Sequence, residues 1–243
     1  MENFSFKNVS FAYPEQENKA LRNISFKVNQ GEFLILCGHS GCGKSTLLRH
    51  LKTCLTPHGV LTGEILFGGK ALNEVDERTQ SKEIGFVLQS PENQVVTDKV
   101  WHELAFGLES LGYDTPTIRR RVAEVAAFFG IENWFYKNVT ELSGGQKQLL
   151  SLASVMAMSP KILVLDEPTA QLDPIAAADF LALLGKINRE LGITVILTEH
   201  RLEEAFPFAT RVIVMEKGEI VCDDAPDQVG LHLRDKDSGM FLA

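Results

Sequence analysis

The stretch GHSGCGKST, Gly38 to Thr46, has the spacing G-x-x-x-x-G-K-[ST]. The apolar run FLILC precedes it and LLRHL follows it, which predicts a buried strand, a glycine-rich loop and a helix from Lys44 to about Lys52. In such a loop the amide hydrogens surround phosphate oxygens, the lysine reaches the β- and γ-phosphates, and the serine hydroxyl ligates Mg²⁺. A plain glycine turn into a helix is the alternative, and the strand-loop-helix context argues against it. The stretch therefore predicts a parallel α/β core with a phosphate site.

The rest of the chain places this loop in a larger pattern. Short runs of alternating polarity predict strands at 4–13, 21–28, 63–72 and 83–89, and the pattern then becomes helical from about Val100 to Met158. Within the helical part, Thr115 caps a helix that ends at Gly130. Alternation resumes with strands at 161–168 and 193–200, helices at 174–192 and from 201, and a closing hairpin at 211–221.

These elements divide a single domain of 243 residues into parts. The core is expected at 1–89 and 159–225, a helical insert at 90–158 and a tail at 226–243. The last residues, LRDKDSGMFLA, are polar and are expected to be poorly ordered.

Composition excludes several classes of protein. With 44% hydrophobic and 23% charged residues the chain has enough apolar side chains for a sizeable core, and its net charge of −8 argues against nucleic-acid binding by broad electrostatics. The apolar runs are too short to cross a bilayer, and the N-terminus has no secretory pattern. The four cysteines show no metal-site spacing, which favours thiols in a reducing compartment, and the arginines 119–121 are expected on a solvated helix face.

Several single residues fall where a phosphate site needs them. Asp166 and Glu167 follow the apolar run ILVL, so Asp166 is expected to hold Mg²⁺ and Glu167 to act as general base on the attacking water. Gln89 and His200 each follow a predicted strand, where an amide could reach Mg²⁺ and water and an imidazole could reach the γ-phosphate. Tyr13 could stack on adenine, or it could be a core aromatic. On local grounds these last three remain open.

A second glycine-led helix start, LSGGQKQ at 142–148, raises the question why one chain has two. Together with the residues above it makes the chain resemble an ATP-binding-cassette (ABC) ATPase over essentially its whole length. The motifs that carry the resemblance are Tyr13, Gly38–Thr46, Gln89, Leu142–Gln146, Ile162–Glu167, Ala170–Pro174 and His200.

The resemblance implies a P-loop NTPase (RecA-like) core with an N-terminal antiparallel β subdomain and an inserted α-helical subdomain. It also implies ATP and Mg²⁺ as cofactors, and two cassettes that meet head to tail as a homodimer, a heterodimer or fused halves. Ser143, Gly144 and Gly145 of one cassette would then cap the γ-phosphate held by Lys44 of the other, which answers the question above.

The site residues that the resemblance implies fall into three groups. The catalytic group is Glu167, His200 and Gln89, and the metal group is Ser45, Gln89 and Asp166. The nucleotide-contacting group is Tyr13, Gly38, His39, Ser40, Gly41, Cys42, Gly43, Lys44, Ser45, Thr46, Ser143, Gly144, Gly145, Gln146 and Asp173, the last as a signal between the two sites. Two segments depart from the commonest family form: Ala170 and Gln171 stand where Ser and Ala are usual, and Glu199 stands where Thr is frequent before the histidine.

The segment QSPENQVVTDKVWHELAFGLESLG, 89–112, and TEHRLEEA, 198–205, resemble the energy-coupling-factor importers of vitamins and of cobalt or nickel ions. Their cassettes work at the cytoplasmic face of the membrane with an integral scaffold and a substrate-binding membrane subunit, and no nucleic acid. Residues from Pro91 to Phe106 would line the groove for the scaffold, with Trp101 favoured for the groove and Phe106 for the core. The competing hypothesis is a soluble cassette of repair, translation or cluster assembly, although the coiled coil or basic linker of the first two is not visible.

Overall fold

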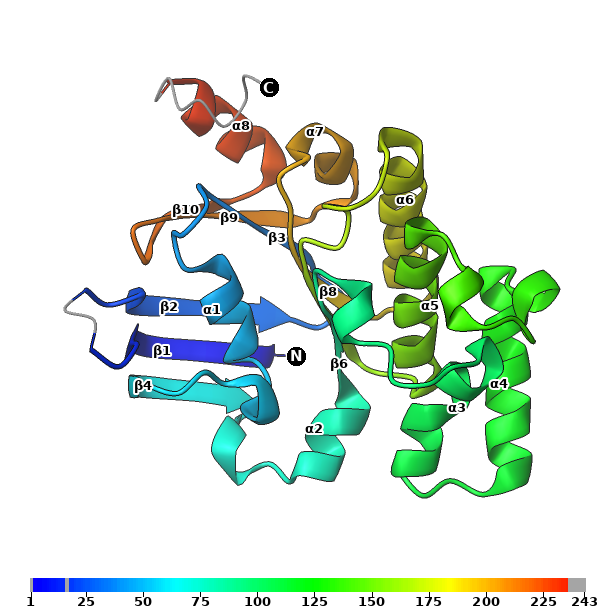
Figure 1. The fold of residues 1–243 in the computed structure, drawn as a ribbon. Helices are drawn as coiled ribbons and strands as arrows, with labels where there is room; N and C mark the ends of the chain where they lie inside the picture. Colours follow the sequence, from blue (N-terminus) through cyan, green and yellow to red (C-terminus); the bar gives the residue numbers. More distant parts are fainter. Residues whose placement is uncertain (1, 16–17, 236–243) are drawn as a thin grey trace.

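The computed structural model describes residues 2–15 and 18–235. Two sheets and the helices around them make up the fold (Figure 1). The predicted ending from Leu233 on lies mostly outside the described residues.

A six-stranded sheet in the order β10-β9-β3-β8-β7-β6 forms the centre. Its strands are β3 (Phe33–Cys37), β6 (Ile84–Val87), β7 (Ile162–Asp166), β8 (Thr194–Thr198), β9 (Arg211–Glu216) and β10 (Glu219–Asp224). All pairs are parallel except β9 with β10, so the predicted closing hairpin also extends the parallel core. Every residue of β3, β7 and β8 is buried, which explains why these strands are continuously apolar.

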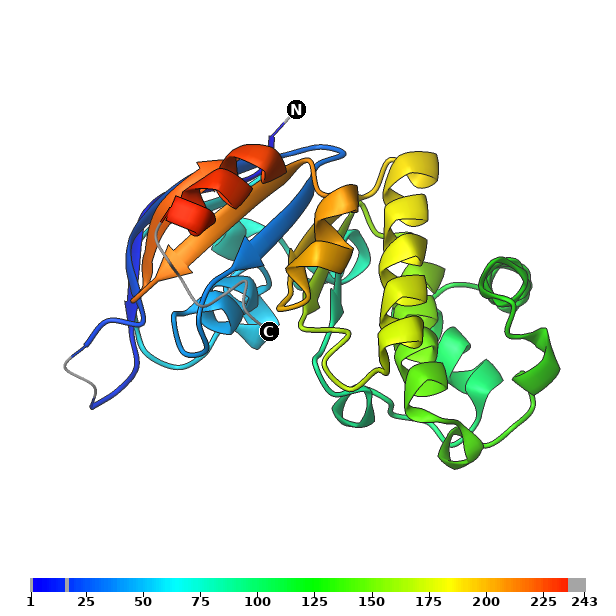
Figure 2. The ribbon, with the colours of Figure 1, turned by 90° about the horizontal axis from the view of Figure 1, so that it is seen from above.

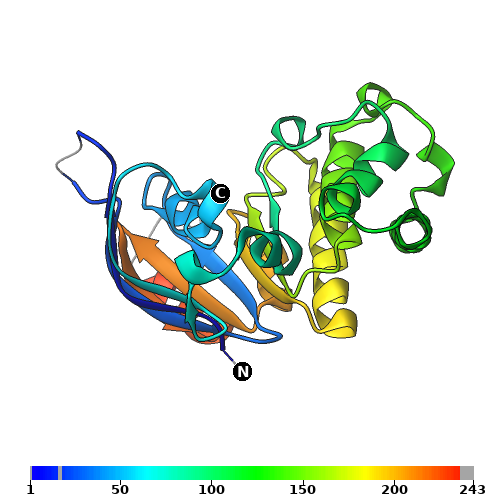
Figure 3. The same ribbon diagram turned by 90° about the horizontal axis from the view of Figure 1, so that it is seen from below.

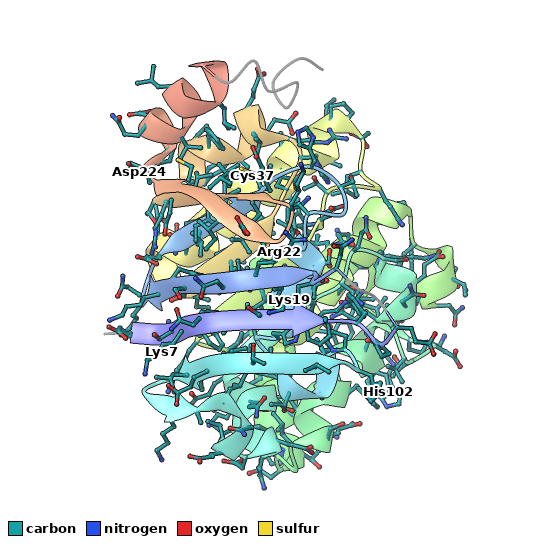
Figure 4. All side chains as sticks on the ribbon, turned by 90° about the vertical axis from the view of Figure 1, so that its left-hand side faces the viewer. Lys7, Lys19, Arg22, Cys37, His102 and Asp224 are labelled. Atoms are coloured by element: carbon teal, nitrogen blue, oxygen red, sulfur yellow. The ribbon has the colours of Figure 1, made fainter. Side chains whose placement is uncertain are left out.

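Alternate residues of the central strands enter two different cores. Ile35 and Leu165 belong to a core shared with the long helices, whereas Leu36 and Val164 belong to one shared with α1 (Lys44–Arg49) and a second sheet. That second, antiparallel sheet has the order β2-β1-β4-β5. Its strands are β1 (Glu2–Ala12), β2 (Leu21–Asn29), β4 (Val60–Phe67) and β5 (Lys70–Ala71). Figure 4 faces this sheet and shows Lys7 on β1 and Arg22 on β2.

The helical insert lies at the opposite end of the molecule from the antiparallel sheet (Figures 2 and 3). It contains α3 (Val100–Ser110), α4 (Thr115–Phe129) and α5 (Gly144–Ala157), and α6 (Pro174–Leu191) lies beside α5. One continuous core joins these helices to the central sheet, so the insert has no separate hydrophobic interior. The remaining helices are α2 (Glu77–Glu83), α7 (Leu202–Ala205) and α8 (Pro226–Asp235), with short 3-10 turns η1 (Thr53–Leu55), η2 (Leu72–Glu74), η3 (Pro91–Asn93), η4 (Glu132–Trp134), η5 (Val139–Glu141) and η6 (Phe206–Phe208).

Three local expectations differ from the structure. The cap of α4 is Asp114, whose carboxylate accepts from the Thr117 N–H, because Thr115 is already the first helical residue. The segment expected as a tail begins with a helix, α8, which packs on β9 and β10, and Leu233, where the poorly ordered ending was expected to start, is 2% exposed in it. Phe106 is 38% exposed, so it is not an ordinary core residue. Among the described helices none has the length and apolar character needed to cross a membrane.

Candidate phosphate site

Two glycines give the loop after β3 its shape. Gly38 has a φ of 144°, and a side-chain carbon there would lie 2.2 Å from the Met215 carbonyl oxygen. Gly43 has a φ of 107°, and its side-chain carbon would lie 2.6 Å from the Ala20 carbonyl oxygen. Larger residues would therefore be strained and would also clash with backbone. This close packing explains the glycines at the two fixed positions of the motif.

Lys44 begins α1 directly after the loop. Its ammonium group donates to the carbonyl oxygens of Gly38, at 2.7 Å, and His39, at 3.2 Å, and the residue is 4% exposed. The cation therefore lies across the loop, next to the first turn of α1 and its outward amide hydrogens. An anion placed there would meet both the ammonium group and the backbone donors.

A carboxylate and a hydroxyl lie together beside the loop. Asp166, at the end of β7, accepts from the Ser45 hydroxyl at 2.9 Å and from the Thr198 hydroxyl at 2.8 Å, all on its Oδ1 atom. Mg²⁺ is usually held by one or two protein oxygens, with phosphate and water completing its octahedron. Ser45 and Asp166 fit that pattern, whereas the Gln89 amide contacts Glu167 instead of either of them.

Glu167 is held from three sides. Its Oε1 atom lies 2.8 Å from Nε2 of His200, and its Oε2 atom accepts from the Gln89 amide at 2.8 Å. Its backbone N–H donates to the Thr198 hydroxyl at 2.9 Å. Glu167 has a φ of 45°, which is uncommon for any residue other than glycine. The structure therefore brings together the three residues expected to act in catalysis, because Gln89 and His200 both contact the Glu167 carboxylate.

A cavity of about 430 Å³ opens beside these groups. Its wall includes Tyr13, Asn18, Lys19, Ala20, Ser40, Gly41, Gly43, Lys44, Ser45, Thr46 and Glu167, while Gly38, His39 and Cys42 belong to the loop but not to this wall. The Tyr13 hydroxyl lies 3.0 Å from that of Thr46, and its ring packs edge-on against Phe11. Tyr13 is thus held in the wall of the cavity by two contacts and is not part of the buried core.

The second glycine-led turn lies elsewhere. Ser143 caps α5 by a reciprocal box, in which its hydroxyl accepts from the Gln146 N–H and its own N–H donates to the Gln146 side chain. Asp173 caps α6 by a single bond, in which its carboxylate accepts from the Ala176 N–H. As far as the structure describes the chain, none of Ser143, Gly144, Gly145, Gln146 and Asp173 lines the cavity. In Figure 1, α5 and α1 lie on opposite sides of β6 and β8.

The two cysteines near the loop are structural. Burial raises the pKa of Cys37 to about 12, against a smaller opposite effect of the Lys44 charge. Burial also raises the pKa of Cys42. Both thiols therefore stay protonated near neutral pH, so neither has the thiolate that nucleophilic or metal chemistry requires.

Comparison with known proteins places this site in a family. Residues 21–170 match the family model of the ABC transporter. The chain belongs to the ABC transporter family. The fold is that of the family's ATP-hydrolysing cassettes.

Relatives with this cassette come from bacteria and archaea. A Bacillus cereus protein, named provisionally as an ABC transporter ATP-binding protein, is 53% identical over 222 residues, which are 91% of this chain and 40% of the relative. A similarly named protein of Methanosarcina acetivorans is 38% identical over 92% of this chain and 68% of its own length. The chain thus spans about 40% of the length of the first curated relatives it matches.

Solved structures agree with the fold. The cbiO1 protein of Clostridium perfringens, part of the ABC transporter complex cbiONQ, has a TM-score of 0.85 and 29% identity, covering 100% of this chain and 96% of its own. A dimeric ATP-binding cassette in a post-hydrolysis state, bound to ADP and Pi, has a TM-score of 0.79 and 28% identity, covering 92% of this chain and 98% of its own.

Sequence reasoning missed several residues of this site. Thr198 and Asp166 are direct partners in the β7–β8 register, so a hydroxyl at the end of one strand meets the acid at the end of the next. The sequence shows Thr198 at the end of an aliphatic run, but it does not show that this strand lies beside the strand that ends at Asp166. Asn18 and Lys19 enter the cavity wall from the loop before β2 (Figure 4 labels Lys19), where the sequence has no recognisable motif.

Proposed function

We propose that this cassette binds Mg·ATP in the cavity beside Lys44 and hydrolyses it in a head-to-tail pair with a second cassette. The observation that carries the proposal is the separation of the two glycine-led turns within one chain. Lys44, Ser45 and Glu167 line one cavity, Asp166 bonds to Ser45 beside it, and the Ser143 turn lies outside its wall. A second cassette would bring its own Ser143 turn over the γ-phosphate held here, where amide hydrogens at a helix start favour an anion.

The residues of the cavity divide the chemistry between them. Lys44 and the loop amides would bind the phosphates, and the Tyr13 ring would lie against the base. Bound Mg²⁺, held through Ser45 and Asp166, would neutralise developing phosphate charge. Glu167 would orient and deprotonate the attacking water. Gln89 and His200 each occupy one oxygen of its carboxylate, which leaves accepting capacity on both oxygens for that water.

The same proposal extends to transport. We infer that the cassette energises an importer of the energy-coupling-factor type, for a vitamin or a transition-metal ion, as a peripheral subunit at the cytoplasmic membrane face. Support comes from the 29% identity over the whole chain to cbiO1, which is part of a transporter complex. The insert also exposes apolar side chains suited to a membrane scaffold, because Val96 is 65%, Trp101 40% and Phe106 38% exposed.

The enzymatic part is tested by replacing Glu167 with Gln. We expect E167Q to bind ATP as the parent does, to lose turnover, and to accumulate as an ATP-dependent dimer, because the γ-phosphate then remains between the two cassettes. ATPase assays and size-exclusion chromatography with and without ATP measure this, with Lys44→Ala as the control that fails to bind. Hydrolysis at the parent rate by E167Q would remove Glu167 from its role.

The transport part is tested by membrane fractionation. The chain is expressed alone and together with a candidate scaffold and a substrate-binding membrane protein, and recovery in the membrane fraction is compared. We expect recovery only with these partners, and expect Trp101→Ser to reduce it while leaving ATPase activity unchanged. A chain that stayed in the supernatant beside its partners would favour a non-transport cassette.

A further inference from the structure

Glu199, the residue before His200, is a buried carboxylate that the chemistry above does not use. It is 3% exposed, and across residues 2–15 and 18–235 no ion pair includes it. A carboxylate removed from water is costly unless its oxygens are hydrogen-bonded. The position therefore calls for an explanation.

Both oxygens of Glu199 are bonded. Its Oε1 atom accepts from the backbone N–H groups of His200, at 2.9 Å, and Arg201, at 3.1 Å. Its Oε2 atom accepts from the Thr169 hydroxyl at 2.7 Å, and Thr169 is fully buried. One side chain thus fixes the turn that carries His200 and ties it to the segment after Glu167.

A second bond makes the same connection. The Arg201 guanidinium donates through Nη2 to the Leu172 carbonyl oxygen at 2.9 Å. We call these two links together, Glu199 to Thr169 and Arg201 to Leu172, the 199–169 bridge. The His200 side chain is 46% exposed, and its backbone N–H is one of the two that Glu199 holds.

The other side of the bridged segment faces the glycine-led turn at residues 142–146, which we call the signature turn. A side-chain carbon on Gly145 would lie 3.8 Å from the Leu172 side chain. Residues 169–172 therefore contact the signature turn through Leu172 and the turn that carries His200 through Thr169, all within one chain.

We propose that Glu199 is a positioning residue that couples His200 to residues 169–172, and through Leu172 to the chain's own signature turn. In a head-to-tail pair that turn covers the other cassette's ATP, so the bridge would connect the two phosphate sites. This inference rests on the proposed function. Coupling of this kind is established only by measuring non-additivity, since proximity alone is not evidence of it.

The test is a double-mutant cycle between Thr169 and His200. Thr169→Val removes the hydroxyl at almost constant volume, and Thr169→Ser keeps it. We expect T169V to lower kcat about tenfold with little change in KM for ATP, and T169S to stay within about twofold, because the buried carboxylate loses a donor only in T169V. In a His200→Ala background T169V should change kcat by less than about twofold, since the residue it positions is gone.

The outcomes separate the two proposals. If H200A alone leaves the rate unchanged, the role of His200 in the proposed function fails, and this inference fails with it. If H200A lowers the rate but T169V lowers it equally in both backgrounds, or in neither, only the coupling is wrong. Should T169V not give folded protein by circular dichroism, Arg201→Met breaks the second link, and the same cycle with H200A decides the question.

Discussion

Thr198 is fully buried, and its hydroxyl bonds to two neighbouring acids at once. It donates to Asp166 Oδ1 at 2.8 Å and accepts from the backbone N–H of Glu167 at 2.9 Å. The first bond keeps the Asp166 carboxylate turned toward Ser45, and the second supports the left-handed backbone of Glu167. One hydroxyl therefore helps to orient both acids.

Replacing Thr198 by Val should separate these functions from folding. We expect T198V to reduce kcat about tenfold and to raise the Mg²⁺ concentration needed for tight ATP binding, since the carboxylate loses a donor that orients it. The Glu167 N–H keeps the Thr198 carbonyl at 3.2 Å, so the fold is retained. Steady-state kinetics and Mg²⁺-dependent nucleotide binding measure the effect. T198S should remain within about threefold of the parent, and equal losses in T198S and T198V would disprove a role for the hydroxyl.

Single residues were predictable from sequence where a motif fixes their spacing. Lys44, Ser45 and Asp166 follow from the loop spacing and from an acid that ends an apolar strand, and they do lie together. Thr198 was not predictable, because its role depends on the β7–β8 register. For Phe106 the core was favoured over the scaffold groove, but the structure leaves it 38% exposed.

At the scale of elements, α4 shows that the capping residue of a helix changes when the predicted helix start is wrong by one position. Asp114 accepts the Thr117 N–H at 2.7 Å, Pro116 lies in the first turn, and Gly130 ends the helix with a φ of 65°. The sequence pattern predicted the helix and its end at Gly130 correctly. The start was misplaced by one residue because Asp and Thr are both good caps, and helix boundaries vary by a residue or two.

Asp114→Ala should lower the melting temperature by roughly 2 °C, whereas Thr115→Ala should leave it nearly unchanged. The Thr117 N–H lowers the pKa of Asp114 from its usual 3.8, so the capping contribution is complete above that pH. It is lost as pH falls through the lowered value, because the unfolded chain then binds the proton more readily. Thermal melts at neutral pH and near pH 3 measure both effects. A T115A variant as unstable as D114A would show that Thr115 is the cap.

At the scale of the whole molecule, alternation along the central strands divides the interior into two cores. Odd-numbered residues of β3 face the long helices, and even-numbered ones face α1 and the antiparallel sheet. Period and apolar runs predicted the parallel core and its helical insert, since they report burial locally, whereas the antiparallel subdomain was implied by the family resemblance. It did not predict the packing of α8 or the single core joining the insert to the sheet, because these depend on contacts between distant segments.

The placement of the two phosphate-binding turns in separate parts of the molecule leads to a last prediction. Lys44→Ala removes the cation at the cavity, and Gly144→Asp places a negative charge on the signature turn, where a side-chain carbon meets nothing within 4 Å and the fold is therefore retained. In a head-to-tail dimer each variant alone has no complete site, so both should be inactive.

A mixed dimer of the two variants has one complete site, formed by the intact Lys44 of one chain and the intact turn of the other. An equimolar mixture should therefore recover up to roughly a quarter of the parent ATPase rate, because half of the dimers are mixed and each has one site of two; coupling between the sites would lower this value. Activity measured as the ratio is varied should be highest at equal amounts, with each variant mixed with itself as the control. If the turn served its own chain's ATP, mixing would restore nothing.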